Sequence, residues 1–211
     1  MTLSHLLYLG VVVAIMAGYY FYNSRRGQNP SATLDDDGFD RARFHADRSD
    51  PRKFWAQAAI ALYQDDTDPG CWKQANALRC LQKGWSTPNG AELVELIQSY
   101  IQGECNLAFD KLRIIFLARA GRGAGWFDEA TSWNYAFNAI ADIQRSYGSW
   151  EQLRHAMDEG RAEWYGGKSE VPKAQLELSN RGWQHLQTEY MPYVPFHGGH
   201  GAPAMVAGPQ A

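Results

Sequence analysis

Apolar residues recur at intervals of three and four between Lys53 and Tyr190, and no alternating strand pattern interrupts them. This spacing places apolar side chains along one face of a helix, so the segment predicts an all-α domain. The predicted helices number about six or seven and form a compact bundle. They span residues 53–64, 71–83, 90–102, 105–120, 128–147, 149–165 and 173–189.

Turn-forming and capping residues mark several of the predicted helix ends. Pro88-Asn89-Gly90 precedes one apolar repeat. Gly148 ends another helix, after which Ser149 and Gln152 form a capping-box pattern that opens the next one. The punctuation therefore supports the helix boundaries that the apolar pattern predicts.

An uncharged segment from Leu6 to Tyr22 precedes the helical pattern. Its 17 residues reach the short end of the range that spans a bilayer as a helix. Aromatic residues at 19–22 and the basic pair Arg25 and Arg26 follow, as at the cytoplasmic side of a membrane anchor. We therefore expect a single-pass helix in a bacterial inner membrane, with the helical domain in the cytoplasm. A cleaved signal peptide is less consistent with the sequence, because it needs a basic start and a clear cleavage site.

Small residues recur every four positions in this segment, at Gly10, Ala14 and Gly18. Such spacing lets a second membrane helix approach closely, which would support a homo-oligomer. Small residues are also frequent in any membrane helix. Both interpretations stay open.

The composition divides the chain into four parts. We expect an anchor at 1–26, a polar linker at 27–50, the helical domain at 51–190 and a disordered tail rich in proline and glycine at 191–211. His197 and His200 in the tail are too few for a metal site. The sequence therefore predicts neither a metal nor a cofactor.

Charge and cysteine content narrow the class of function. The net charge of −3 and the absence of a basic run interleaved with aromatics exclude nucleic acid as an expected partner. Cys71, Cys80 and Cys105 are odd in number and suit reduced thiols better than a disulfide framework. The cysteines thus favour a reducing compartment.

Alternating glycines at 121–125 resemble part of a phosphate-binding loop. The segment follows a predicted helix instead of a strand, however, and lacks the lysine and hydroxyl residue of such a loop. We interpret these glycines as allowing a close turn between two helices.

Four charged residues in otherwise apolar helices form the candidate site. They are Asp110, Arg113, Arg119 and Arg161. Asp110 lies three positions before Arg113, so the two side chains share a helix face and can pair. One interpretation is a partly buried ion-pair network that fixes the packing of two long helices. In that interpretation three tryptophans fill the space between the helices, namely Trp126, Trp150 and Trp164.

The other interpretation of the same residues is an anion pocket. Arg113 or Arg161 would bind the anion, and Asp110 would orient the arginine. No Ser-His-Asp arrangement and no second carboxylate beside Asp110 is recognisable. We therefore predict no catalytic residue, and the sequence favours a protein that is not an enzyme.

Two blocks of sequence resemble a known family. They comprise Ala108-Phe109-Asp110, Arg113, Arg119-Ala120-Gly121, Gly125-Trp126 and Asp128-Glu129-Ala130, followed by Tyr147-Gly148-Ser149-Trp150 and Gly160-Arg161-Ala162-Glu163-Trp164. The family is the bacterial domain of unknown function 1266, and the resemblance covers about residues 72–166. Its members usually carry tryptophan where Phe109 stands here. The resemblance implies a helical domain and no established activity.

These observations lead to three hypotheses about function. The first is a membrane-anchored helical domain that acts as a protein-interaction or scaffold module through an unidentified protein partner. The second is a domain that binds an anion or small molecule, with or without catalysis, around the Asp/Arg cluster. The third is an accessory or immunity-type protein of a bacterial secretion or toxin system, for which no particular residue argues.

Overall fold

The computed structural model describes residues 39–64, 68–103 and 107–197. Within these ranges the chain forms eight α-helices and no strand, and an isolated bridge joins Phe39 to Trp72. The predicted all-α fold is therefore confirmed. The α-helices are α2 (Arg41–Asp47), α3 (Pro51–Gln64), α4 (Gln74–Arg79), α5 (Gly90–Gln102), α6 (Leu107–Gly123), α7 (Glu129–Ser146), α8 (Trp150–Trp164) and α9 (Lys173–His185). Short helical turns are η1 (Pro69–Cys71), η2 (Cys80–Gly84), η3 (Lys168–Glu170) and η4 (Leu186–Tyr190).

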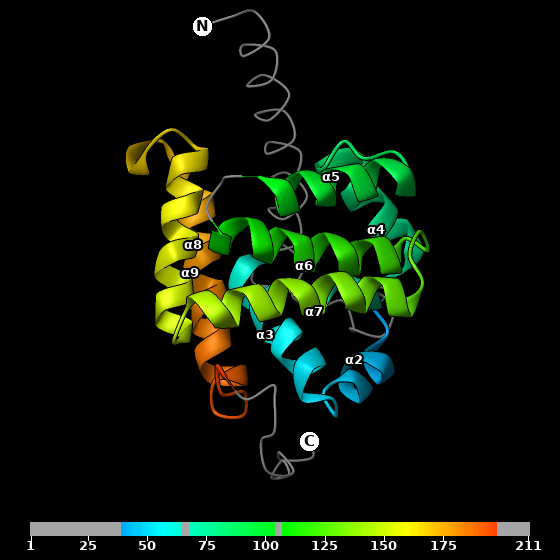
Figure 1. The fold of residues 1–211 in the computed structure, drawn as a ribbon, viewed down its shortest axis with the longest axis horizontal. Coiled ribbons are helices and arrows are strands. Elements are labelled where there is room, and N and C mark those ends of the chain that lie inside the picture. Colours follow the sequence, from blue (N-terminus) through cyan, green and yellow to red (C-terminus); the bar gives the residue numbers. More distant parts are fainter. Residues whose placement is uncertain (1–38, 65–67, 104–106, 198–211) are drawn as a thin grey trace, which may run out of the picture.

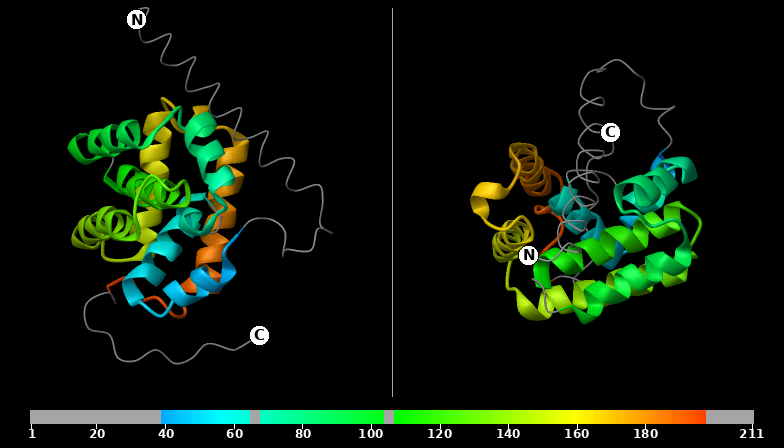
Figure 2. Two further views of the ribbon diagram at one scale, coloured as in Figure 1. Left: turned by 90° about the vertical axis from the view of Figure 1, so that its right-hand side faces the viewer. Right: turned by 90° about the horizontal axis from the view of Figure 1, so that it is seen from above.

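Helix α6 lies at the centre of the bundle. Every residue from Ala108 to Gly121 is buried, as expected for a helix covered on all sides. Figure 1 shows α5, α6 and α7 side by side, with α6 in the middle. Helix α8 stands at one end of this layer, roughly at right angles to its helices, and α3 contacts both α6 and α7 from behind (Figures 1 and 2). Side chains on α6 can therefore meet residues from most of the other helices.

Local capping explains several helix starts. The side chain of Asn89 accepts a hydrogen bond from the backbone N–H of Glu92, and α5 spans the predicted residues 90–102. Ser149 accepts from the backbone N–H of Gln152, whose side-chain oxygen accepts from the N–H of Gly148. The predicted capping of α8 is confirmed.

The packed domain extends further at both ends than the expected range of 51–190. Phe44 of α2 is buried, although it belongs to the expected linker. Val194 and Phe196 are buried within the expected tail. Their carbonyl oxygens accept hydrogen bonds from the indole N–H groups of Trp150, at 3.1 Å, and Trp55, at 2.9 Å. Residues 39–50 and 191–197 are thus packed parts of the fold. Their polar, turn-rich composition does not indicate this packing, because it depends on a few aromatic residues that contact distant parts of the chain.

The described ranges contain no helix long and apolar enough to cross a membrane. The expected anchor at Leu6 to Tyr22, with Gly10, Ala14 and Gly18, lies outside these ranges. The anchor and its self-association stay predictions.

Close packing explains two of the alternating glycines. Gly121 and Gly123 belong to the last turns of α6, which continues three residues past the predicted end at 120. A Cβ atom on Gly123 would lie 2.3 Å from the carbonyl oxygen of Pro69. Gly125 adopts φ +76°, which favours glycine, in the turn toward α7. The glycines thus serve packing and a tight turn, in line with our interpretation.

Candidate functional site

Four aromatic side chains surround the guanidinium group of Arg113 on α6. Its central carbon lies 3.9 Å from the ring centroid of Phe109 and 4.1 Å from that of Trp164. Tyr100 and Trp85 lie further out, at 5.3 Å and 5.9 Å. We call Trp85, Tyr100, Phe109 and Trp164 the aromatic cage. Trp85 directly follows η2, and the other members come from α5, α6 and α8, so the cage forms only when these parts of the chain pack together.

Arg113 has few polar partners for a buried cation. It is 5% exposed, and its Nη1 atom lies 3.6 Å from Oδ1 of Asp110 and 3.5 Å from the hydroxyl oxygen of Tyr100. The expected pair of Asp110 and Arg113 is therefore present, but it is long. The Nε–H group is buried, and no described residue accepts a hydrogen bond from it.

The end of α8 places a second arginine beside the cage. Arg161 is 3% exposed, and its Nη1 atom donates to Oδ1 of Asp158 at 3.2 Å. Its guanidinium carbon lies 6.0 Å from the ring centroid of Phe109, which Arg113 also contacts. Arg113 and Arg161 thus both lie near the ring of Phe109. Burial lowers the pKa of Arg161, and the nearby carboxylate of Asp158 opposes that change.

Tyr165 follows α8 and adds a second unused polar group. Its hydroxyl group is buried, and no described residue hydrogen-bonds to it. Burial, and then the neighbouring Tyr63, raises the pKa of Tyr165 to about 12, although the positive charges of Arg161 and Arg113 act in the opposite direction. The phenol therefore stays protonated at neutral pH and can donate a hydrogen bond.

Asp110 is buried beside Arg113. Burial raises the pKa of its carboxyl group above the ordinary range, against the effects of Arg113 and Lys111. Burial disfavours the charged form of a carboxyl group, which explains this direction. We refer to Asp110, Arg113, Arg161 and Tyr165, together with the aromatic cage, as the Arg113 site.

Arg119 belongs to a separate cluster, although it lies on the same helix. Its Nε atom donates to Oδ1 and Oδ2 of Asp68 at 3.0 and 3.1 Å, and its Nη2 atom donates to Oδ2 at 2.9 Å. Its Nη1 atom donates to the hydroxyl of Ser132 at 3.2 Å, and the ring of Trp133 stacks 3.6 Å away. The four candidate charges therefore do not form one network. The sequence did not reveal Asp68, because it lies 51 positions before Arg119 in an irregular turn.

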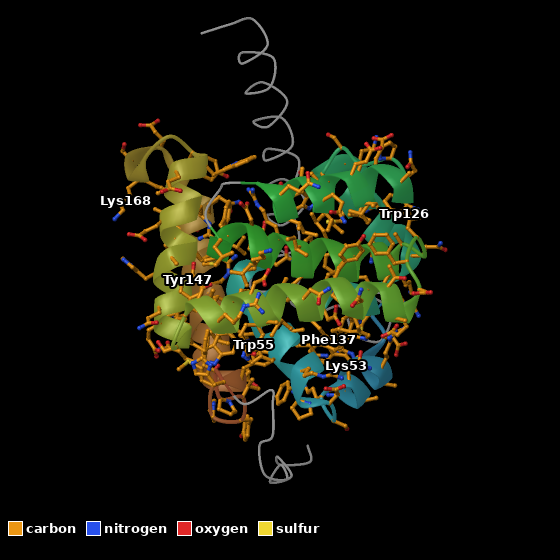
Figure 3. The ribbon with its side chains drawn as sticks, in the orientation of Figure 1. Lys53, Trp55, Trp126, Phe137, Tyr147 and Lys168 are labelled. Carbon is orange, nitrogen blue, oxygen red and sulfur yellow. The ribbon has the colours of Figure 1, made fainter. Side chains whose placement is uncertain are left out.

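The three expected structural tryptophans lie in different places. Trp150 is buried and stacks on Trp55, with ring centroids 4.6 Å apart. Trp126 lies at the end of α6 remote from α8 (Figure 3). Trp164 alone belongs to the Arg113 site. The three side chains therefore do not fill one space between two helices, because each of them contacts a different part of the bundle.

A set of potential metal ligands lies in the Arg119 cluster. The ligand atoms of Asp47, Asp68 and Cys71 lie within 4.8 Å of one another, and all three residues are buried. Arg119 already supplies a cation there, since its Nη2 atom lies 2.9 Å from Asp68 and 3.8 Å from Asp47. Burial, and then the charge of Asp68, raises the pKa of the Cys71 thiol. The burial of the thiol and the ion pair of Asp68 with Arg119 favour a structural role for this cluster.

Comparison with known proteins identifies one family. The model described as a protein of unknown function, DUF1266, matches residues 16–192. Searches of the curated proteins and of the solved structures found no match. The matched range is wider than the expected resemblance at 72–166 and begins within the expected anchor. Bacterial origin stays a prediction, and the family description assigns no activity.

Proposed function

The chain belongs to the DUF1266 family of unknown function, and we propose that its helical domain binds an anionic ligand at the Arg113 site. One observation carries this proposal: the buried guanidinium of Arg113 has an Nε–H group without an acceptor and only long contacts on its other side. Leaving a buried donor unsatisfied costs about 1–3 kcal/mol. A bound anion would remove that cost.

The contrast with Arg119 supports the proposal. Arg119 is also fully buried on α6, but every one of its nitrogens donates to a neighbouring side chain. The fold can therefore satisfy a buried arginine completely where the arginine has only a structural role. Incomplete satisfaction of Arg113 is what a binding residue would show in the absence of its ligand.

The remaining residues of the site have complementary roles in this proposal. Arg161 contributes a second positive charge, and the hydroxyl of Tyr165 contributes a hydrogen-bond donor. Asp110 lies against Nη1 of Arg113, which leaves the opposite edge of the guanidinium for the ligand. The aromatic cage excludes water around Arg113, which strengthens its attraction for an anion.

Anion titration of the protein tests the proposal. Sulfate, phosphate, acetate and benzoate are titrated separately by calorimetry into the wild type and the Arg113→Met variant. We expect at least one anion to bind the wild type and to bind the variant at least tenfold more weakly. Arg145→Met is the matched control, since the side chain of Arg145 is 72% exposed and pairs with Asp142, which is not part of the Arg113 site. Equal binding by the wild type and Arg113→Met, or no binding by either, would contradict the proposal.

The membrane anchor, the protein-interaction role and the immunity-type role stay predictions from the sequence. The anchor rests on residues 6–22, outside the described ranges. Protease treatment of spheroplasts that express the chain tests its direction: digestion of the helical domain would contradict the predicted cytoplasmic placement.

A further inference from the structure

Arg113 and Arg119 present the same edge of the guanidinium group to different surroundings. In Arg119 the Nε and Nη2 atoms, which lie along one edge, both donate to the carboxylate of Asp68. In Arg113 the Nη1 atom faces Asp110 and Tyr100, whereas the buried Nε–H group, which lies on the same edge as Nη2, donates to no described residue. The protein thus contains one guanidinium edge that binds a carboxylate of the same chain, in Arg119, and a second one without such a partner among the described residues, in Arg113.

We propose that the Nε–Nη2 edge of Arg113 binds the carboxylate group of a small organic acid, in the way that Arg119 binds Asp68. This inference rests on the proposed anion-binding function and specifies the class of ligand. The carboxylate would accept two parallel N–H bonds from Arg113. One of its oxygens would also accept the hydrogen bond that the buried hydroxyl of Tyr165 offers.

The aromatic cage favours a planar group over a tetrahedral one. Phe109 and Trp164 lie 3.9 and 4.1 Å from the guanidinium carbon of Arg113, close enough to cover its faces, and such rings favour an acceptor that approaches in the plane of the guanidinium. Both oxygens of a carboxylate lie in that plane. A phosphate would direct further anionic oxygens out of the plane toward aromatic faces, which carry partial negative charge.

The charges near the site also favour a singly charged ligand. Asp110 lies 3.6 Å from Arg113, and Asp158 pairs with Arg161 at 3.2 Å. Each arginine therefore already faces one carboxyl group, and a ligand with two negative charges would meet more repulsion than a ligand with one. Because Trp164 and Tyr100 are only partly buried, an apolar body attached to the carboxylate can pack against them.

The test compares acids of different shape on the full chain. Acetate, benzoate and inorganic phosphate are titrated into the wild type, Arg113→Lys, Arg113→Met and Tyr165→Phe. We expect benzoate to bind at least tenfold more tightly than phosphate and acetate to lie between them. Arg113→Lys keeps the charge but loses the two-donor edge, so it should weaken benzoate binding at least tenfold. Tyr165→Phe should weaken it several-fold.

The outcomes separate this inference from the function on which it rests. Phosphate binding that equals or exceeds benzoate binding, and that is lost in Arg113→Met, would overturn the carboxylate inference and leave the anion site intact. Full benzoate affinity in Arg113→Lys with loss in Arg113→Met would also overturn it, because charge alone would then suffice. Binding of no probe, or binding that Arg113→Met leaves unchanged, would overturn both. Arg145→Lys controls for the general effect of replacing an arginine by lysine.

Discussion

Replacement of Arg119 by methionine should destabilise the domain far more than the same replacement of Arg113. Arg119→Met removes three hydrogen bonds to Asp68 and one to Ser132, and it leaves the fully buried carboxylate of Asp68 without its counter-ion. Removing one partner of a buried ion pair costs about 3–5 kcal/mol. We expect the free energy of unfolding to fall by that amount.

Arg113→Met should change the free energy of unfolding by less than about 2 kcal/mol. The lost polar contacts are the 3.6 Å pair with Asp110 and the 3.5 Å hydrogen bond to Tyr100, both at the long end of the range for such contacts. The cation–π contacts with Phe109 and Trp164 are lost as well. The substitution also removes the unsatisfied Nε donor, whose burial costs about 1–3 kcal/mol. The methionine sulfur can pack favourably among the aromatic rings.

Urea unfolding without added anions measures both variants. Tryptophan fluorescence and far-ultraviolet circular dichroism are followed together, so that a two-state transition can be verified before the free energies are compared. A loss for Arg113→Met as large as that for Arg119→Met would refute the reasoning. Arg113 would then be a structural residue like Arg119, and the proposed anion site would lose its basis.

Three further predictions concern packing and pH. Gly123→Ala should lower the free energy of unfolding by about 1–3 kcal/mol in urea titrations, because its Cβ would meet the carbonyl oxygen of Pro69; Gly84→Ala, with open space around its Cβ, is the control, and equal losses would contradict the packing argument. The neutral phenol of Tyr165 stabilises the fold fully below pH 10 and loses this effect as the pH rises toward about 12, since its pKa is raised on folding. Tyr165→Phe should therefore lose less stability than the wild type over that interval, and parallel losses would count against burial of the hydroxyl. Anion affinity of the wild type should fall as the pH rises through the raised pKa of Asp110, because its carboxylate then repels the ligand. Asp110→Asn should flatten this dependence in calorimetric titrations, and an unchanged slope would place the titrating group elsewhere.

Two arginines on one helix show why sequence alone could not separate structural from binding residues. In the sequence both stand in the same apolar context of α6. The partner that distinguishes them, Asp68, lies far away along the chain and reaches Arg119 only through the packing of η1 against α6. Whether a buried arginine finds a hydrogen-bond acceptor is therefore decided by the folded molecule and not by the sequence around it.

The pattern of apolar residues and caps by itself determined helices α3 to α9, whereas α2 lies within the expected linker. Their class, most of their boundaries and the pairing of Asp110 with Arg113 depend on contacts between residues at most four positions apart, which the 3.6-residue period places on one face. The same local reasoning failed for residues 191–197, where a few contacts with distant tryptophans outweigh a turn-rich composition.

Only the tertiary structure decided what surrounds the charged residues. The aromatic cage combines side chains from four separate parts of the chain between positions 85 and 164, and no local period relates them. The tertiary packing likewise fills the edge of Arg119 with Asp68 and leaves the edge of Arg113 open. Long-range packing sets which buried donors find an acceptor, and those donors are the basis for the proposed function.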